Sequence, residues 1–147
     1  MNSKVKTIWM VDDDADDREI FQEIIENLDC EYNFHGFNNG SSAIARLDDE
    51  VPDILFLDLN MPPLDGYQTL EKIREHTKFN EIPRIIIFTT SISDFDQNQT
   101  FEMGASMFLT KFADYNKVRE TLKQILDIDW ESREITRETF IYKPLNK

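Results

Sequence analysis

The sequence predicts a doubly wound α/β domain, in which a five-stranded parallel sheet carries helices on both faces. Five short apolar segments alternate along the chain with five segments of helical hydrophobic period. The apolar segments are continuous instead of alternating in polarity, which is typical of strands buried on both faces. Because right-handed crossovers connect such strands through helices, a parallel sheet follows.

Each expected strand is indicated by its apolar run and by the residues that bound it. The first run ends abruptly at Asp12, the third runs from Pro52-Asp53 into Asp58, and Pro83 introduces the fourth and most apolar run. The five strands are expected at residues 5–11, 32–37, 54–57, 85–88 and 107–109.

Each expected helix is indicated by apolar residues three or four positions apart. Acidic residues begin the first helix, where the helix dipole favours negative charge. The segment 40–42 opens a short second helix, and Gly104 ends a polar fourth helix. The five helices are expected around residues 20–28, 40–47, 67–73, 91–103 and 118–126.

Composition excludes several classes of function. The 147 residues hold 16 basic and 29 acidic side chains, a net charge of −13. Because such a surface repels phosphate backbones, we expect no nucleic-acid binding. No apolar run approaches the ~20 residues that span a membrane, so we expect no membrane partner. The single Cys30 cannot form an internal disulfide and no secretory signal is present, which favours a cytoplasmic protein.

Polar side chains gather where the expected strands end. In an open parallel sheet the carboxyl ends of the strands share one edge, where ligands bind. We therefore expect three carboxylates, a hydroxyl and an ammonium in one site. The residues are Asp12 and Asp13 after the first strand, Asp58 after the third, Thr89 or Thr90 after the fourth, and Lys111 after the fifth.

This expected cluster suits phosphoryl transfer to a carboxylate. Clustered carboxylates repel one another, and a divalent cation removes that cost. Few oxygen ligands, with room left for water and phosphate oxygens, favour Mg²⁺. Asp58 would be the nucleophile, Lys111 would pair with the incoming phosphate, and Thr89 would donate a hydrogen bond to it. Each residue alone has a simpler interpretation as a turn, strand or surface residue, but their joint placement favours a site.

At these residues the sequence resembles the receiver domain of bacterial two-component response regulators, the CheY-like family. The similarity runs from about residue 4 to 126, and the segment Phe-Leu-Asp-Leu-Asn-Met-Pro-Pro-Leu-Asp-Gly at 56–66 is similar to the phosphorylation loop. The resemblance implies a flavodoxin-like sheet with strand order 2-1-3-4-5. The implied magnesium ligands are Asp12, Asp13, the phosphoacceptor Asp58 and the backbone carbonyl of Asn60.

The same resemblance assigns roles to residues near the last two strands. The family places its switch hydroxyl 22 positions before its lysine, which selects Thr89 as the partner of Lys111. Phe108 lies at the family's aromatic switch position, and the alternative is plain core packing. Asn60 and Ser91 lie at positions that tune the slow self-dephosphorylation of the family.

One departure from the family is Phe112, which stands where proline usually follows the lysine in a cis peptide. A cis bond costs about 2.5–4 kcal/mol before phenylalanine and ~0.5–1 kcal/mol before proline, so the geometry of this bond stays open. The other site positions match the family. We therefore expect a phosphoacceptor, not an enzyme, with an inactive pseudo-receiver as the alternative.

The resemblance implies protein partners. Family members take the phosphoryl group from a sensor histidine kinase or a histidine phosphotransfer protein and then change their contacts with a downstream target. We expect a stand-alone receiver domain at residues 1–126 and a C-terminal extension at 127–147, too short for an output domain. The apolar residues of the extension predict packing on the domain itself. The alternative is contact with a partner or with a second copy in a homodimer.

Two other protein classes share part of this pattern. A haloacid dehalogenase-type phosphatase also has a nucleophilic aspartate after a strand, but it needs a second aspartate two residues on as general acid. That position is Asn60, which cannot transfer a proton. A flavodoxin-like electron carrier has a phosphate-binding Ser/Thr/Gly loop after the first strand, where this chain has three aspartates that repel phosphate.

Overall fold

Five parallel strands form one sheet in the order β2-β1-β3-β4-β5, which confirms the predicted fold class and strand order. The structure is a computed structural model and describes residues 5–60, 65–76 and 84–142. The observed β3 matches its predicted range, and the other four strands differ from theirs by one or two residues at their ends. They are β1 (Thr7–Val11), β2 (Asn33–Phe37), β3 (Ile54–Leu57), β4 (Arg84–Thr89) and β5 (Met107–Thr110).

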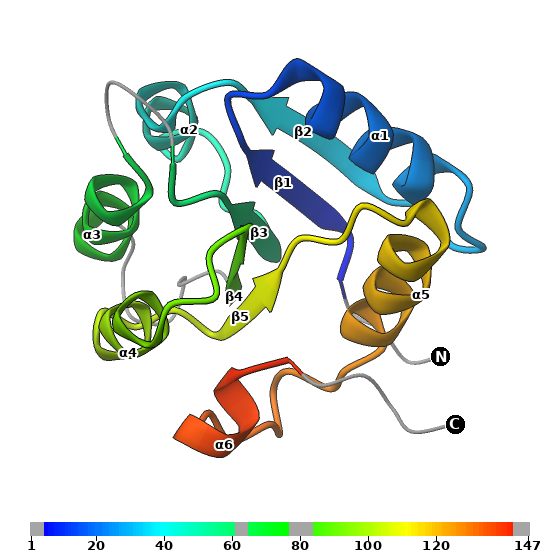
Figure 1. Cartoon of the computed structure of the whole chain (residues 1–147). Helices are drawn as coiled ribbons and strands as arrows, with labels where there is room; N and C mark the ends of the chain where they lie inside the picture. Colours follow the sequence, from blue (N-terminus) through cyan, green and yellow to red (C-terminus); the bar gives the residue numbers. More distant parts are fainter. Residues whose placement is uncertain (1–4, 61–64, 77–83, 143–147) are drawn as a thin grey trace.

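Helices cover both faces of the sheet, with α1 and α5 on one side and α2, α3 and α4 on the other (Figure 1). Within the described ranges, no helix is long and apolar enough to cross a membrane. The helices are α1 (Ala15–Glu26), α2 (Gly40–Arg46), α3 (Gly66–His76), α4 (Asp94–Glu102), α5 (Tyr115–Leu126) and α6 (Arg137–Phe140).

The sheet separates two apolar cores, which explains why the strand sequences are continuously apolar. Successive residues of β1 point to opposite faces, so Ile8 and Met10 pack under α1 and α5. Trp9 and Val11 pack on the other face, against α2 and α3. All four side chains are at most 1% exposed. Burial of both faces therefore replaces the polar–apolar alternation of a half-exposed sheet.

The polar fourth helix begins later than predicted. The sequence predicted a helix from Ser91, but α4 begins at Asp94 because Ser93 caps it, accepting a hydrogen bond from the N–H of Asp96 (2.9 Å). Gly104 follows this helix with φ of 92°, in the left-handed region that glycine adopts most easily. The residues between β4 and α4 therefore form a loop beside the carboxyl edge of the sheet.

The C-terminal segment, residues 127–142, lies along the outer edge of the sheet beyond β5 (Figure 1). Ile141 forms an isolated parallel bridge with Phe108 of β5, whose carbonyl accepts a hydrogen bond from the N–H of Tyr142 (3.0 Å). Phe140 is buried, and its ring lies 5.3 Å from that of Phe101 in α4. These contacts cover the backbone edge that β5 would otherwise expose.

Gly66 begins α3 at a close approach to the backbone after β3, where an added Cβ would lie 2.4 Å from the carbonyl oxygen of Asp58 and 2.4 Å from Cα of Leu59. We expect Gly66→Ala to lower the free energy of unfolding by at least about 2 kcal/mol, because these backbone atoms cannot rotate away. Urea denaturation measures the change. Gly36→Ala is the control, since its Cβ would meet side chains and no backbone: the flexible side chain of Arg18 at 3.3 Å and the ring of Phe34 at 3.6 Å. Equal losses in both variants would contradict the steric argument.

Candidate functional site

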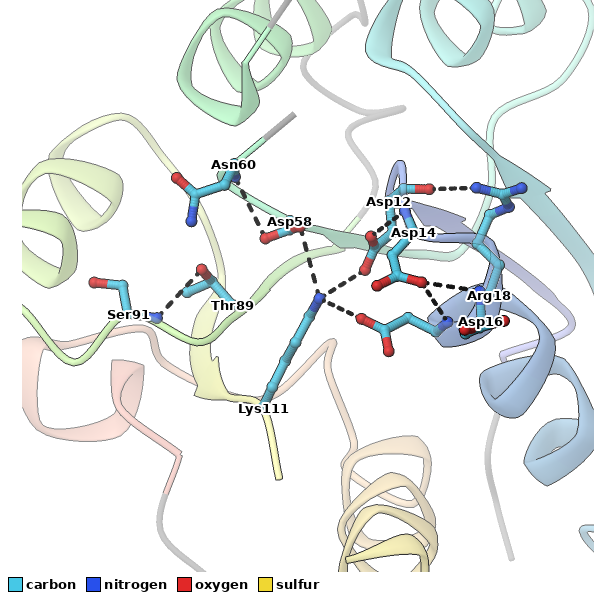
Figure 2. Close-up of polar contacts among 10 residues, drawn as sticks. Asp12, Asp14, Asp16, Arg18, Asp58, Asn60, Thr89, Ser91 and Lys111 are labelled. Carbon is cyan, nitrogen blue, oxygen red and sulfur yellow. Dashed lines mark hydrogen bonds and ion pairs between the residues drawn. The ribbon is translucent and has the colours of Figure 1, made fainter. Parts of the chain in front are cut away.

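The site lies at the carboxyl edge of the sheet, where one polar residue follows each of three strands (Figure 2). Asp12 follows β1, Asp58 follows β3, and Lys111 follows β5. Backbone hydrogen bonds extend beyond the strands and hold these residues in place. The bonds run from the N–H of Asp12 to the carbonyl of Phe37 (3.0 Å), from Asp58 to Val11 (3.0 Å) and from Lys111 to Thr89 (2.7 Å).

The ammonium group of Lys111 joins the acidic residues of the site. Its Nζ lies 2.8 Å from Oδ2 of Asp12, 2.8 Å from Oδ2 of Asp17 and 3.6 Å from Oδ2 of Asp58. Lys111 makes these contacts although Phe112 replaces the usual proline. Burial opposes the charged form of Lys111, but the hydrogen bonds to Asp12 and Asp17 outweigh it and raise the pKa of the ammonium. The lysine therefore stays charged.

Two of the carboxylates are buried and incompletely neutralised. Asp12 is 1% exposed and Asp58 is 7% exposed. Burial raises the pKa of Asp12, although the hydrogen bond from Lys111 opposes the change. Burial also raises the pKa of Asp58, against the attraction of Lys111 and together with the repulsion of Asp12. One ammonium is thus insufficient for this group of negative charges, and a further cation would stabilise it.

Three carboxylates are close enough to bind one cation. Asp12, Asp13 and Asp58 each offer an oxygen, and these oxygens all lie within 4.8 Å of one another. Asp13 is exposed while the other two are buried, so the cluster is open to solvent on one side. Hard oxygen ligands with an open side match the preferences of Mg²⁺, which keeps several waters or phosphate oxygens when bound. The residues present therefore fit a magnesium site.

Asn60 and Thr89 also lie at this edge, but their predicted roles are not tested by the geometry. The backbone N–H of Asn60 approaches Oδ1 of Asp58 (3.4 Å). Thr89 ends β4 fully buried, and its Oγ1 accepts a hydrogen bond from the N–H of Ser91 (3.4 Å). Phe108 is buried in the core beneath α6. Metal binding by the carbonyl of Asn60 and the switch roles of Thr89 and Phe108 stay predictions.

Two residues that contact the site residues were missed in the sequence. Asp17 pairs with Lys111, and Arg18 donates a hydrogen bond from Nη1 to the carbonyl of Asp12 (2.8 Å). The acidic start of α1 had a sufficient explanation in the helix dipole. The sequence contains no spacing signal for either contact, because both depend on how the start of α1 is placed at the carboxyl edge of the sheet.

Comparison with known proteins identifies the family of this chain. The model of the response regulator receiver domain family matches residues 8–123. The chain belongs to this family. The matched range contains every site residue described above, from Asp12 to Lys111. Receiver domains take phosphoryl groups from histidine kinases, bind Mg²⁺ or Mn²⁺ at an acidic pocket, and are typically phosphoacceptors instead of true enzymes.

Two curated relatives show how differently receiver domains are placed in whole proteins. Hybrid signal transduction histidine kinase L of Dictyostelium discoideum is 30% identical over 122 residues, which cover 80% of this chain but 7% of the kinase. Response regulator Rcp1 of Synechocystis sp. is 27% identical over 113 residues, which cover 72% of this chain and 76% of Rcp1. The first relative is therefore far longer than this receiver, and the second is of similar length.

Solved structures of receivers share the fold. The phosphorylated cyanobacterial phytochrome response regulator RcpA superimposes with a TM-score of 0.76 at 26% identity, over 87% of this chain and 95% of RcpA. The Mn²⁺-bound form of Rcp1 superimposes with a TM-score of 0.73 at 23% identity, over 89% of this chain and 99% of Rcp1. At that identity, the second likeness is evidence for the fold alone.

The raised pKa of Asp58 predicts how its neutralisation affects stability. Below about pH 4 the carboxyl is protonated in both the folded and unfolded states and costs nothing. As pH rises through the folded-state pKa, the buried carboxyl of Asp58 ionises and the free energy of unfolding of wild type falls. Asp58→Asn has no charge at this position and does not show this fall. We therefore expect Asp58→Asn to melt at a higher temperature than wild type at neutral pH with a chelator present, and the difference to shrink towards pH 4. Thermal melts across this range measure it.

The control for this prediction is Asp49→Asn, which removes the same charge from an exposed position. We expect this variant to follow the wild-type melting curve at every pH. A lower melting temperature for Asp58→Asn at neutral pH would mean that the attraction of Lys111 outweighs the cost of burying Asp58.

Proposed function

We propose that this receiver accepts a phosphoryl group on Asp58 from a sensor histidine kinase or a histidine phosphotransfer protein, with Mg²⁺, and thereby changes its contacts with a downstream protein. The observation that carries the proposal is a cluster of three carboxylates at one edge of the sheet, those of Asp12, Asp13 and Asp58. The ammonium of Lys111 contacts two of them, Asp12 and Asp58. The cytoplasm is the compartment in which we expect this relay.

The transfer follows from the chemistry of the site. A carboxylate oxygen of Asp58 attacks phosphorus while the bond between phosphorus and the donor's imidazole nitrogen breaks, and the electron pair leaves with the imidazole. Lys111, with its Nζ 3.6 Å from Asp58, is placed to pair with a phosphoryl oxygen. Asp12, Asp13, Asp58 and the Asn60 carbonyl would hold Mg²⁺, which supplies positive charge that offsets the charge of the phosphoryl oxygens.

The surface beside Lys111 suits a partner that brings a histidine to Asp58. A cavity of about 170 Å³ opens between α1 and the start of α5, directly beside the lysine. Phe21, Phe88 and Phe112 contribute to its lining, and the partly exposed Ile20 and Tyr115 lie at its surface. We propose that the phosphodonor protein docks here through apolar side chains.

Thr89 and Phe108 would then respond to the phosphoryl group and transmit its presence to the α4 and β5 side of the receiver.

Direct phosphorylation tests the proposed function. Incubation with acetyl phosphate or phosphoramidate and Mg²⁺ should add one phosphoryl group to wild type, and Asp58→Asn should gain none. Asp13→Asn should need a higher Mg²⁺ concentration for the same rate, because one oxygen ligand loses its charge. Intact-mass spectrometry measures all three. Normal labelling of Asp58→Asn would place the acceptor elsewhere, and no labelling of wild type under any condition would favour a pseudo-receiver.

We also propose that residues 127–142 are an integral part of this receiver. Trp130 donates a hydrogen bond from Nε1 to the carbonyl of Ile125 (3.2 Å), and its own carbonyl accepts one from Arg84 (3.0 Å). Arg137 pairs with Glu102 of α4 (2.6 Å). These contacts support packing of the segment on its own domain. In the homodimer alternative, a second copy of the chain would supply the partners of these residues.

Truncation of Phe140, which is 2% exposed, measures what this packing contributes. We expect Phe140→Ala to lower the free energy of unfolding by about 3 kcal/mol, the usual cost of removing a buried phenylalanine side chain. Phe95→Ala is a matched control, because its ring is 69% exposed and its loss should change stability by less than about 0.5 kcal/mol. Equal and small effects in urea denaturation would show that the segment does not stabilise the receiver.

A further inference from the structure

Asp96 lies outside the carboxylate cluster, yet its carboxylate connects two segments that border the site. Its Oδ1 accepts a hydrogen bond from the phenol of Tyr67, in the first turn of α3. Its Oδ2 accepts one from the hydroxyl of Ser91 (2.6 Å), in the loop between β4 and α4. A single carboxylate in the first turn of α4 therefore bridges α3 and this loop.

Both hydroxyl donors adjoin residues of the proposed site. Tyr67 directly follows Gly66, whose N–H donates to the carbonyl of Leu59 (2.9 Å), the residue after the proposed phosphoacceptor. Ser91 donates its own N–H to Oγ1 of Thr89 (3.4 Å). The bridge made by Asp96 thus joins the segments that follow β3 and β4, from which the proposed acceptor and the proposed switch hydroxyl come.

The hydroxyl of Ser91 is held in one direction by two hydrogen bonds. It donates to Asp96, and it accepts from the N–H of Ser93 (3.1 Å) at the start of α4. Figure 2 shows the Ser91 side chain directed away from Asp58, although the two residues follow neighbouring strands. A serine hydroxyl rotates to suit its partners. Loss of the Asp96 carboxylate would remove the acceptor of the Ser91 hydroxyl proton and leave this hydroxyl free to turn to another acceptor.

The position of Asp96 is itself well determined. Its N–H donates to Oγ of the helix cap Ser93 (2.9 Å), and its carbonyl accepts from the hydroxyl of Thr100 (2.7 Å). Burial and the hydrogen bond to Asp96 raise the pKa of the Tyr67 phenol, so Tyr67 keeps its proton and remains a donor. The carboxylate is therefore anchored on α4 and held on both oxygens.

We infer that Asp96 is a positioning residue that lengthens the lifetime of the phosphorylated receiver by holding the Ser91 hydroxyl away from the phosphoryl group. The inference rests on the proposed function. Loss of the phosphoryl group is attack by water on phosphorus: a new oxygen–phosphorus bond forms, the bond to the Asp58 oxygen breaks, and the carboxylate leaves with the electron pair. The water's proton passes to solvent and inorganic phosphate is released. A free Ser91 hydroxyl can hydrogen-bond and orient that water, and a hydroxyl held by Asp96 cannot.

The test follows loss of the phosphoryl group in the full chain. Each protein is phosphorylated with phosphoramidate and Mg²⁺, the donor is removed, and the decay is followed by intact-mass spectrometry. We expect Asp96→Ala to lose its phosphoryl group about 10-fold faster than wild type. Asp96→Asn keeps an acceptor oxygen and should decay at a rate between the two. Asp94→Ala removes an exposed acid from the same helical turn and should decay like wild type.

A double-mutant cycle separates positioning from a general structural effect. In a Ser91→Ala background, Asp96→Ala should leave the decay rate unchanged, because no hydroxyl remains to be released. Acceleration of equal size in both backgrounds would overturn the inference, as would an unchanged decay rate for both Asp96 variants in a normally phosphorylated protein. If wild type itself gains no phosphoryl group, the proposed function fails and this inference fails with it.

Discussion

The contact between one partly buried ammonium and several carboxylates is the interaction on which the rest of the site depends. Lys111 comes from the end of β5, and its carboxylate partners come from β1, α1 and β3, so the charge attraction joins distant parts of the chain. Asp12 and Asp58 still have raised pKa values, which means that this attraction does not fully offset their burial. A further positive charge, such as the divalent cation that receiver domains bind, would therefore stabilise the site.

Parallel strand order converts residues far apart in sequence into this cluster. The strands β1 and β3 are neighbours in the sheet, so Asp12 and Asp58 leave it side by side. The next strand, β4, brings Thr89 to the same edge, and β5 brings Lys111. The apolar cores on both faces hold the strands in register. The strands therefore position the polar residues that follow them, although these residues lie outside regular secondary structure.

The helix α4 contacts the site loops at one end and the C-terminal segment at the other. Near its start, Asp96 bonds to Tyr67 and Ser91. Near its end, Phe101 packs its ring against that of Phe140, and Arg137 lies 4.7 Å from the centre of the Phe101 ring. Since α4 takes part in both sets of contacts, a change in the conformation of the loop after β4 and a change in the packing of α6 would both affect this helix.

The sequence by itself determined the fold class and most of the candidate site. Continuous apolar strands separated by helical periods are typical of a parallel sheet covered on both faces, and such a sheet brings Asp12, Asp58 and Lys111 to one edge. Only the tertiary structure decided which side chains meet. Lys111 and Asp17 are 94 positions apart, and Tyr67 and Asp96 are 29 apart. Such contacts depend on how helices pack on the sheet. The apolar period of a helix indicates which face is buried, but no spacing in the sequence indicates which polar side chains of two distant elements will meet.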